Sequence, residues 1–318
     1  MKDDERDYCD FYMQTCLETL TNKYRITLRI VLYGPSGAGK TSILKLIKTL
    51  NLKDVLSTVP SVTVEKEIKK LLLMKLIFFA LPGQKRYLFN REMLVKYLSN
   101  ADALFYVVDS ANPASFRFAR IMLHHTLSIL ATLGKQIPIF ILANKQDLPN
   151  ALPIAVIRDS IWSPLMKEFP DIKVYFFAVS VLNPTTVVRV INECLRLYLQ
   201  LNRENNVFPL RLLELTNAES IVIFDQDGFP IFFSDSENDA YSTIGLVLEL
   251  FNLIQKEIKQ NIANGFGIIR VGNYTLAFVR RQIDKDYSVT IAIKNFHVSV
   301  NEISSILTDL LQQPSCTL

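Results

Sequence analysis

Apolar and polar residues along the first two-thirds of the chain form short apolar runs that are separated by longer amphipathic segments. The short runs are apolar at almost every position, which is typical of strands covered on both faces. The predicted strands are Ile26–Tyr33, Leu71–Phe79, Ala103–Asp109, Ile137–Ala143 and Val174–Ala178, and the predicted helices are Thr41–Leu50, Pro113–Leu133 and Thr185–Leu201. This order predicts an α/β fold, with a mostly parallel sheet and helices on both of its faces.

The pattern changes after a polar stretch, Asn202–Pro209, which we interpret as a domain boundary. Beyond it, short strands flank the dipeptides Asp227-Gly228 and Gly272-Asn273, which are typical of hairpin turns. The predicted strands are Ser220–Phe224, Pro230–Ser234, Gly267–Val271, Tyr274–Arg280 and Ser288–Ile293, with helices at about 241–261 and at Val300–Leu311. We therefore predict an N-terminal extension (1–24), an α/β domain (25–202) and a smaller α+β domain (209–318) with an antiparallel sheet.

The N-terminal extension contains a predicted short amphipathic helix over residues 11–20. Such a helix could contact a membrane, or it could cover a groove of the protein. Its polar residues are acidic or neutral rather than rich in lysine, which favours packing against the protein.

Composition narrows the class of protein without identifying it. Of 318 residues, 49% are hydrophobic and 21% charged, as expected of a globular chain. The formal net charge of +4 is too small to indicate nucleic acid as the main partner. The four cysteines are scattered, no apolar run approaches the roughly 20 residues of a membrane-spanning helix, and the acidic N-terminus lacks a secretion signal. We expect a cytoplasmic protein, with peripheral membrane contact at most.

A glycine-rich segment, Gly34–Thr41, follows the first predicted strand and opens the first predicted helix. It has the pattern G-x-x-x-x-G-K-[ST], whose backbone N–H groups wrap around nucleotide phosphates. Lys40 is expected to reach the β- and γ-phosphates, and the hydroxyl of Thr41 to bind Mg²⁺. The residues predicted to hold the phosphates are Gly34, Ser36, Gly37, Ala38, Gly39, Lys40, Thr41 and Ser42.

A second motif, Asn144-Lys145-Gln146-Asp147, follows another apolar strand and selects the base. A carboxylate at Asp147 can accept hydrogen bonds from the N1–H and exocyclic amine of guanine, which adenine does not offer. Asn144 would bind the other edge of the base, and the stem of Lys145 would cover its face. Together with the phosphate-binding pattern, this motif predicts GTP and GDP as ligands.

The run Asn144–Ala151 (NKQDLPNA), with Tyr106–Ser110 (YVVDS) upstream, resembles the Arf branch of small GTPases, and the resemblance covers residues 25–200. It implies two switch segments. In the first, Ser61 would bind Mg²⁺ together with Thr41 and sense the γ-phosphate. In the second, Gly83 would donate its N–H to the γ-phosphate and Gln84 would orient the attacking water.

The chain departs from the family pattern at three places. Ala80 replaces an aspartate that supports Mg²⁺ through water, and Pro82 replaces a glycine of the second switch. Ser180 and Val181 match the family's last base-binding motif loosely, with backbone contacts near the guanine implied. We expect nucleotide binding to survive, the dependence on Mg²⁺ to be weakened and intrinsic hydrolysis to be slow.

No catalytic constellation is found in the C-terminal part of the chain. Its order of strands and helices resembles the roadblock family of small dimerising domains. A GTPase domain followed by such a domain resembles the Rag GTPases of nutrient signalling, which implies pairing with a second copy, with a paralogue or with other proteins.

Two functions remain open on the sequence. The first is a regulatory switch that alternates between GTP and GDP with the help of an exchange factor, an activating protein and effectors. The second is a scaffold that holds guanine nucleotide with little or no hydrolysis, as Ala80 and Pro82 would favour. A third interpretation, an ATP-using kinase, would require the Asn144–Asp147 motif to be coincidental.

Overall fold

The computed structural model describes residues 26–49, 63–71, 74–84, 90–200, 217–224, 230–234, 265–271, 274–284 and 287–294. These fall into two compact units. One comprises Ile26–Lys70 and Met74–Cys194, and the C-terminal strands belong to the other. The expected boundary at 202–209, the N-terminal helix at 11–20 and the two C-terminal helices lie outside the described residues.

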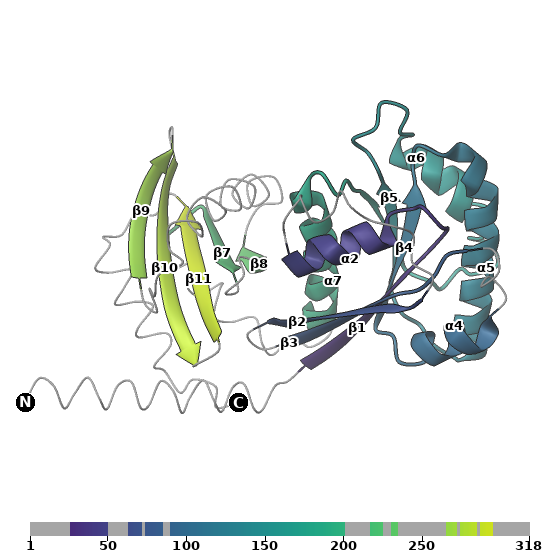
Figure 1. The fold of residues 1–318 in the computed structure, drawn as a ribbon, viewed down its shortest axis with the longest axis horizontal. Coiled ribbons are helices and arrows are strands. Elements are labelled where there is room, and N and C mark those ends of the chain that lie inside the picture. Colours follow the sequence, from purple (N-terminus) through teal and green to yellow (C-terminus); the bar gives the residue numbers. More distant parts are fainter. Residues whose placement is uncertain are drawn as a thin grey trace, which may run out of the picture. The chain divides into compact units, whose positions relative to one another are not determined.

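The first unit is built on a six-stranded sheet of order β2-β3-β1-β4-β5-β6 (Figure 1). Strand β1 pairs in parallel with both β3 and β4, and β5 pairs in parallel with β4 and β6. The strands are β1 (Ile26–Tyr33), β2 (Glu65–Leu71), β3 (Met74–Ala80), β4 (Ala103–Asp109), β5 (Ile139–Asn144) and β6 (Val174–Ala178). The predicted α/β fold, with a mostly parallel sheet, is therefore confirmed.

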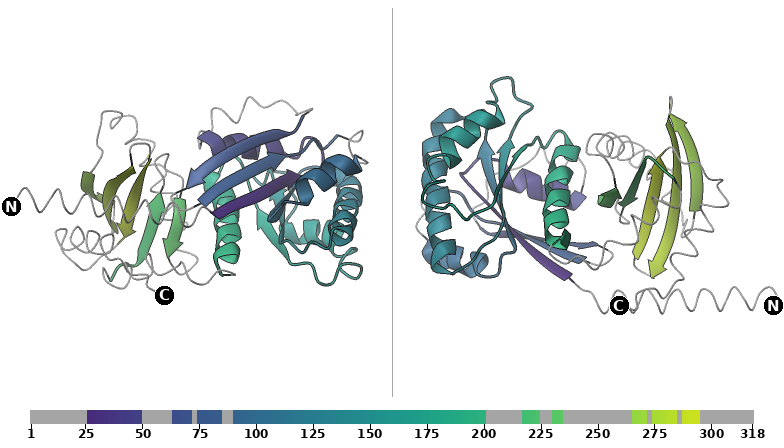
Figure 2. Two further views of the ribbon diagram at one scale, coloured as in Figure 1. Left: turned by 90° about the horizontal axis from the view of Figure 1, so that it is seen from below. Right: turned by 180° about the vertical axis from the view of Figure 1, so that it is seen from behind.

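Helices cover both faces of this sheet, which explains why its central strands are apolar at consecutive positions. Helices α2 and α7 lie on one face, and α4, α5 and α6 lie on the other (Figures 1 and 2). Every residue of β5 is buried. The helical elements are α2 (Lys40–Thr49), α4 (Arg91–Leu98), the 3₁₀ turn η2 (Pro113–Ser115), α5 (Phe116–Thr132), α6 (Ile154–Ile157), the π-helical turn η3 (Arg158–Trp162) and α7 (Pro184–Gln200).

The largest difference from the sequence-based prediction lies in the apolar run Leu71–Phe79. The structure divides this run between two strands, with Leu71 ending β2 and β3 beginning at Met74. Strand β2 (EKEIKKL) was not predicted, because its charged residues do not resemble a buried strand. It lies at the edge of the sheet, where charged side chains are common because they discourage pairing with other chains.

Two short helices on one face were also missed. Helix α4 has eight residues, begins after Asn90, whose side chain accepts a hydrogen bond from the N–H of Met93 at 2.9 Å, and buries Leu94 and Leu98. Helix α6 has four residues and continues directly into η3. Elements this short carry too few apolar repeats to give a periodic signal.

The described strands of the second unit, within residues 220–294, form a five-stranded sheet of order β8-β7-β11-β10-β9. All of its pairings are antiparallel, as predicted. Its strands are β7 (Ser220–Phe224), β8 (Pro230–Ser234), β9 (Gly265–Val271), β10 (Tyr274–Asp284) and β11 (Tyr287–Lys294). The last strand therefore lies between the first hairpin and the second, which joins distant parts of the chain into one sheet.

Among the described residues, no helix has both the length and the apolar character that a membrane span requires.

The burial of β5 makes a first prediction. Leu142 is fully buried, so Leu142→Ala should lower the free energy of unfolding by about 2–5 kcal/mol through lost contacts and an unfilled cavity. Ile121 on α5 is 46% exposed, and Ile121→Ala should change the free energy of unfolding by less than about 0.5 kcal/mol. Urea unfolding followed by the fluorescence of Trp162, the single tryptophan and 6% exposed, reports this unit. Equal effects of the two substitutions would contradict the assigned core.

Candidate functional site

The phosphate-binding pattern forms the turn between β1 and α2, where it requires glycine at two close approaches. Gly34 has φ +136° and faces the backbone of Val107, so that a Cβ would collide with the Val107 carbonyl oxygen. Gly39 has φ +101°, and a Cβ there would collide with Nδ2 of Asn144. Both conformations are unfavourable for a residue with a side chain. The turn is thus pressed against the ends of β4 and β5.

Lys40 is the first residue of α2 and is only 7% exposed. Its Nζ donates hydrogen bonds to the carbonyl oxygens of Gly34 and Pro35, both at 2.8 Å. Burial lowers the pKa of Lys40 to about 8, and the charge of Glu65 partly opposes that fall. A buried ammonium at a helix N-terminus is a favourable environment for an anion such as a phosphate.

The remaining loop residues differ in exposure. Ser36 and Gly37 are exposed, Ala38 is buried, and Gly39, Thr41 and Ser42 are partly buried. Gly37 has φ +77°, with open space where its side chain would be. The loop therefore has an open rim and a buried floor, as a phosphate cradle needs.

The base-specificity motif meets this loop through Asn144, the last residue of β5. Its Nδ2 donates to the carbonyl oxygen of Ala38 at 2.8 Å. Its Oδ1 is buried and has no hydrogen-bond partner in the described part of the chain. An unpaired buried acceptor costs about 1–3 kcal/mol, which a ligand with a suitable donor would recover. Asn144 therefore suits a nucleotide site.

Lys145 and Asp147 are held in place by side chains from other loops. Lys145 has φ +66°, and its Nζ contacts Oδ2 of Asp109 at 2.6 Å. Asp147 is exposed, and its Oδ1 accepts a hydrogen bond from Oγ of Ser180 at 2.5 Å. Because Ser180 holds one carboxylate oxygen, the other is available for a base.

Ser180 itself is buried two residues beyond the end of β6, while Val181 is partly buried. The N–H of Ser180 donates to Oγ1 of Thr186 at 3.0 Å, and the Oγ of Ser180 also accepts from the N–H of Leu182 at 3.1 Å. This segment, which matches a base-binding motif loosely, thus lies beside Asp147. Its contact with Asp147 is through a side chain, whereas the sequence pattern led us to expect backbone contacts with the base.

The second switch segment begins at the end of β3 and reaches the phosphate loop. The carbonyl oxygen of Gly83 accepts a hydrogen bond from the N–H of Ser36 at 2.9 Å. A Cβ at Gly83 would collide with the backbone carbonyl oxygen of Gly34 and lie 2.6 Å from Nζ of Lys40, so only glycine fits there without a shift of the phosphate loop. Pro82 is buried and Gln84 is partly buried. Gly83 is therefore next to the phosphate cradle, as the family pattern implied.

Thr41 and Glu65 form the part of the site suited to a metal ion. Oγ1 of Thr41 lies 3.5 Å from Oε1 of Glu65. A hydroxyl and a carboxylate are oxygen donors, which Mg²⁺ prefers, and Mg²⁺ usually takes the rest of its ligands from phosphates and waters. These residues therefore suit a magnesium ion at the phosphates. Ser61, the other predicted magnesium ligand, lies outside the described residues.

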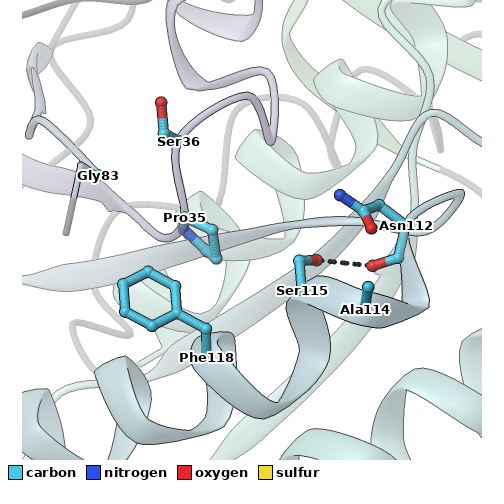
Figure 3. A pocket seen from close by; sticks show the side chains of 7 residues that line it. All are labelled: Pro35, Ser36, Gly83, Asn112, Ala114, Ser115 and Phe118. Atoms are coloured by element: carbon cyan, nitrogen blue, oxygen red, sulfur yellow. Dashed lines mark hydrogen bonds between the residues drawn. The ribbon is translucent and has the colours of Figure 1, made fainter.

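A cavity of about 300 Å³ opens where the second switch meets the phosphate loop. It lies between Pro35 and the start of α5, with Phe118 on one side, as Figure 3 shows. Along the edge of this cavity, Oγ of Ser115 donates a hydrogen bond to the carbonyl oxygen of Asn112 at 2.7 Å. The lining residues are Pro35, Ser36, Gly83, Asn112, Ala114, Ser115 and Phe118.

Sequence reasoning missed two charged residues of this site, Glu65 and Asp109. Asp109 was quoted only as part of a resemblance, although it ends a strand next to Asn144 in register. Glu65 lies in the strand that was not predicted.

Comparisons with known proteins identify the family of the chain. Residues 13–193 match the ADP-ribosylation factor family. The chain is 30% identical over 169 residues to ADP-ribosylation factor-like protein 8b of Arabidopsis thaliana, which covers 53% of the chain and 86% of that protein. It is 31% identical over 140 residues to ADP-ribosylation factor-like protein 4C of Homo sapiens, which covers 42% of the chain and 69% of that protein.

Solved structures with a similar fold include the Arl6 BBS3 small GTPase of Trypanosoma brucei, with the bound nucleotide analogue GppNp. It is 22% identical, with a TM-score of 0.46, and the match covers 54% of the chain and 96% of that structure.

With a family match over more than half of its length, the chain belongs to the ADP-ribosylation factor family of small GTPases, which are regulatory GTP-binding switches.

Proposed function

We propose that this chain binds GTP and GDP through the residues described above, with the phosphates at Gly34–Ser42 and the base at Asn144, Lys145 and Asp147. The observation that carries the proposal is the hydrogen bond from Asn144 to Ala38, which ties the base motif to the phosphate loop. A nucleotide has its base and phosphates at opposite ends, so a site for one requires both motifs at a fixed separation. Magnesium would be held by Thr41 and, as the family pattern implies, by Ser61.

The switch itself would work through Gly83. Its carbonyl oxygen accepts a hydrogen bond from the N–H of Ser36, and its Cα is too close to the backbone of Gly34 and Pro35 for any side chain. The same short segment carries Gln84, which in this proposal orients the attacking water. When GTP is bound, the added γ-phosphate favours one arrangement of this segment, and partners recognise that arrangement.

Hydrolysis would be slow without a partner. Ala80 provides no carboxylate at the end of β3, and Pro82 has no N–H and a fixed φ angle beside Gly83. Members of this family hydrolyse GTP, so the chain is proposed to do so at a low intrinsic rate that an activating protein raises.

A second candidate function is a scaffold that keeps its nucleotide. It is favoured by the burial of both Ala80 and Pro82, because two buried residues in the second switch resist rearrangement.

For the C-terminal unit we propose dimerisation or partner docking, in a Rag-like arrangement with a roadblock-like domain. The order β8-β7-β11-β10-β9 supports this, since β8 and β9 are edge strands within the described sheet. Exposed edges can pair with strands of another chain. We further propose that the protein is cytoplasmic, with any membrane contact peripheral.

The test of nucleotide identity is to denature the purified full-length chain and separate the released nucleotide by ion-exchange chromatography. Guanine nucleotide is expected. Mostly GDP would support the switch, and mostly GTP would support the scaffold. Adenine nucleotide, or none after loading with GDP and GTP, would refute the proposal.

Asp147→Asn should shift the base preference from guanine to xanthine, because an amide donates where the carboxylate accepts. Loss of two charge-assisted hydrogen bonds, about 3 kcal/mol together, predicts roughly a hundredfold weaker GDP binding. Binding of fluorescent GDP and of xanthosine diphosphate measures both effects. Asp159→Asn, the same change at an exposed residue of η3, is the control and should leave both affinities as they are.

Gln84→Leu should leave GDP binding unchanged and slow single-turnover GTP hydrolysis about a hundredfold or more, because the attacking water loses its orienting group. The measurement is the conversion of preloaded GTP to GDP over time. An unchanged, measurable rate would show that Gln84 does not act in the reaction. A parent chain with no hydrolysis at all would favour the scaffold.

If the C-terminal unit dimerises, the full chain should sediment as two species whose ratio changes with protein concentration. Analytical ultracentrifugation between low and high micromolar concentrations tests this. A single monomeric species throughout would leave docking of a different protein as the role of this unit.

A further inference from the structure

Ala80 ends β3 where the chain approaches the phosphate loop. Its side chain is 2% exposed and carries no polar group, and three residues later Gly83 contacts Ser36. A magnesium ion at bound phosphates keeps several waters and is usually bound through one or two carboxylates in addition. A carboxylate from the neighbouring strand does reach the start of α2, because Oε1 of Glu65 lies 3.5 Å from the hydroxyl oxygen of Thr41.

We propose that Glu65 serves magnesium binding in place of a carboxylate at position 80, by accepting hydrogen bonds from the waters of the ion that Thr41 binds. The inference rests on the proposed function, since the ion would be held together with a nucleotide.

The pairing of β2 with β3 supports this exchange of positions. Only two residues separate Leu71, at the end of β2, from Met74, at the start of β3, so the two strands run antiparallel. Counting back from these two residues brings Lys66 opposite Phe79 and Glu65 opposite Ala80. Nζ of Lys66 lies 5.8 Å from the centre of the Phe79 ring, which agrees with this register.

Residues that face each other across an antiparallel pair have Cβ atoms about 4.5–5.5 Å apart, on the same face of the sheet. Strand β2 is one strand further from β1, and hence from the phosphate loop, than β3 is. Glutamate is one methylene longer than aspartate, which offsets part of that distance. The contact with Thr41 shows that the carboxylate reaches the start of α2.

The face of β2 that carries Glu65 is the face toward α2. Glu67 lies two residues along the strand and therefore on the same face. Its Oε2 is 3.6 Å from Nζ of Lys48, near the end of α2. Glu65 and Glu67 thus contact the first and last turns of the same helix, with Glu65 at the turn that carries Lys40 and Thr41.

The charges at this end of the helix are consistent with a role toward a cation. Glu65 interacts electrostatically with the buried ammonium of Lys40. Bound phosphates would neutralise the ammonium of Lys40 more effectively than Glu65 does. The carboxylate of Glu65 would then be left to act on a divalent ion beside the phosphates.

The test measures the release of a fluorescent GDP analogue from the full-length chain at buffered free Mg²⁺ concentrations. In the parent, Mg²⁺ should slow release. Glu65→Gln should raise the Mg²⁺ concentration needed for half of this effect about tenfold or more, as for other groups that support metal ligands. The release rate in excess chelator should stay at the parent value, because the nucleotide contacts are intact. Glu67→Gln, the same change on the same face, should behave as the parent.

Restoring a carboxylate at the opposite position is the second arm. Adding Ala80→Asp to Glu65→Gln should return the Mg²⁺ dependence toward that of the parent. A Glu65→Gln chain with parental Mg²⁺ dependence would overturn the inference. So would one whose release is faster to the same extent with and without Mg²⁺, because Glu65 would then be structural. A parent that binds GDP without any response to Mg²⁺ would overturn it too, while leaving the proposed function intact. A parent that binds no guanine nucleotide would overturn both.

Discussion

The candidate site depends on the close approach between the phosphate loop and the carboxyl end of β5. Asn144 donates a hydrogen bond to the Ala38 carbonyl, and Gly39 lies so close to the same amide that no side chain fits between them. In the proposed nucleotide site, this approach fixes the distance between the residues for the phosphates and those for the base. It also leaves Asn144 with a buried acceptor and Lys40 with a buried ammonium. Burial of an unpaired acceptor and of an ammonium is unfavourable in itself, so both favour a ligand that supplies a donor and an anion.

The second switch is joined to this arrangement through its backbone. The carbonyl oxygen of Gly83 accepts a hydrogen bond from the N–H of Ser36, and Gly83 lies near Nζ of Lys40. A change at bound phosphates would therefore alter the direct contacts of Gly83. The neighbouring residues limit how this segment can rearrange, since Pro82 has a fixed φ angle and Ala80 is apolar and buried. The chain thus combines a phosphate loop that keeps the expected pattern with a second switch segment that departs from it, and that contrast separates the switch and scaffold hypotheses.

In our proposal, Glu65 on one strand of a hairpin supplies the charge that the family pattern has at position 80 on the other. In a hairpin, two opposite positions share a face and a neighbourhood. A carboxylate lost from one can therefore be supplied by the other. Comparison of single positions registers only the loss at Ala80, which is why the sequence led us to expect weaker dependence on magnesium.

The local motifs were determined by the sequence alone. The Gly34–Thr41 loop, the Asn144–Asp147 motif and the apolar strands of the parallel sheet follow from chemistry and periodicity over a few residues, and the family assignment follows from them. Ends of elements were less certain, as in the Leu71–Phe79 run, because apolar character alone does not show where one strand ends and its partner begins.

Contacts between distant residues were decided only by the tertiary structure. The bond of Ser180 to Asp147, the ion pair of Lys145 with Asp109 and the contact of Glu65 with Thr41 each join residues that lie far apart in the chain. Strand β2 was missed for the same reason, since its charged residues become a strand only by pairing with β3 at the edge of the sheet. Local propensity depends on residues that are neighbours in the sequence. Strand register and contacts between side chains depend instead on how the strands are ordered in space.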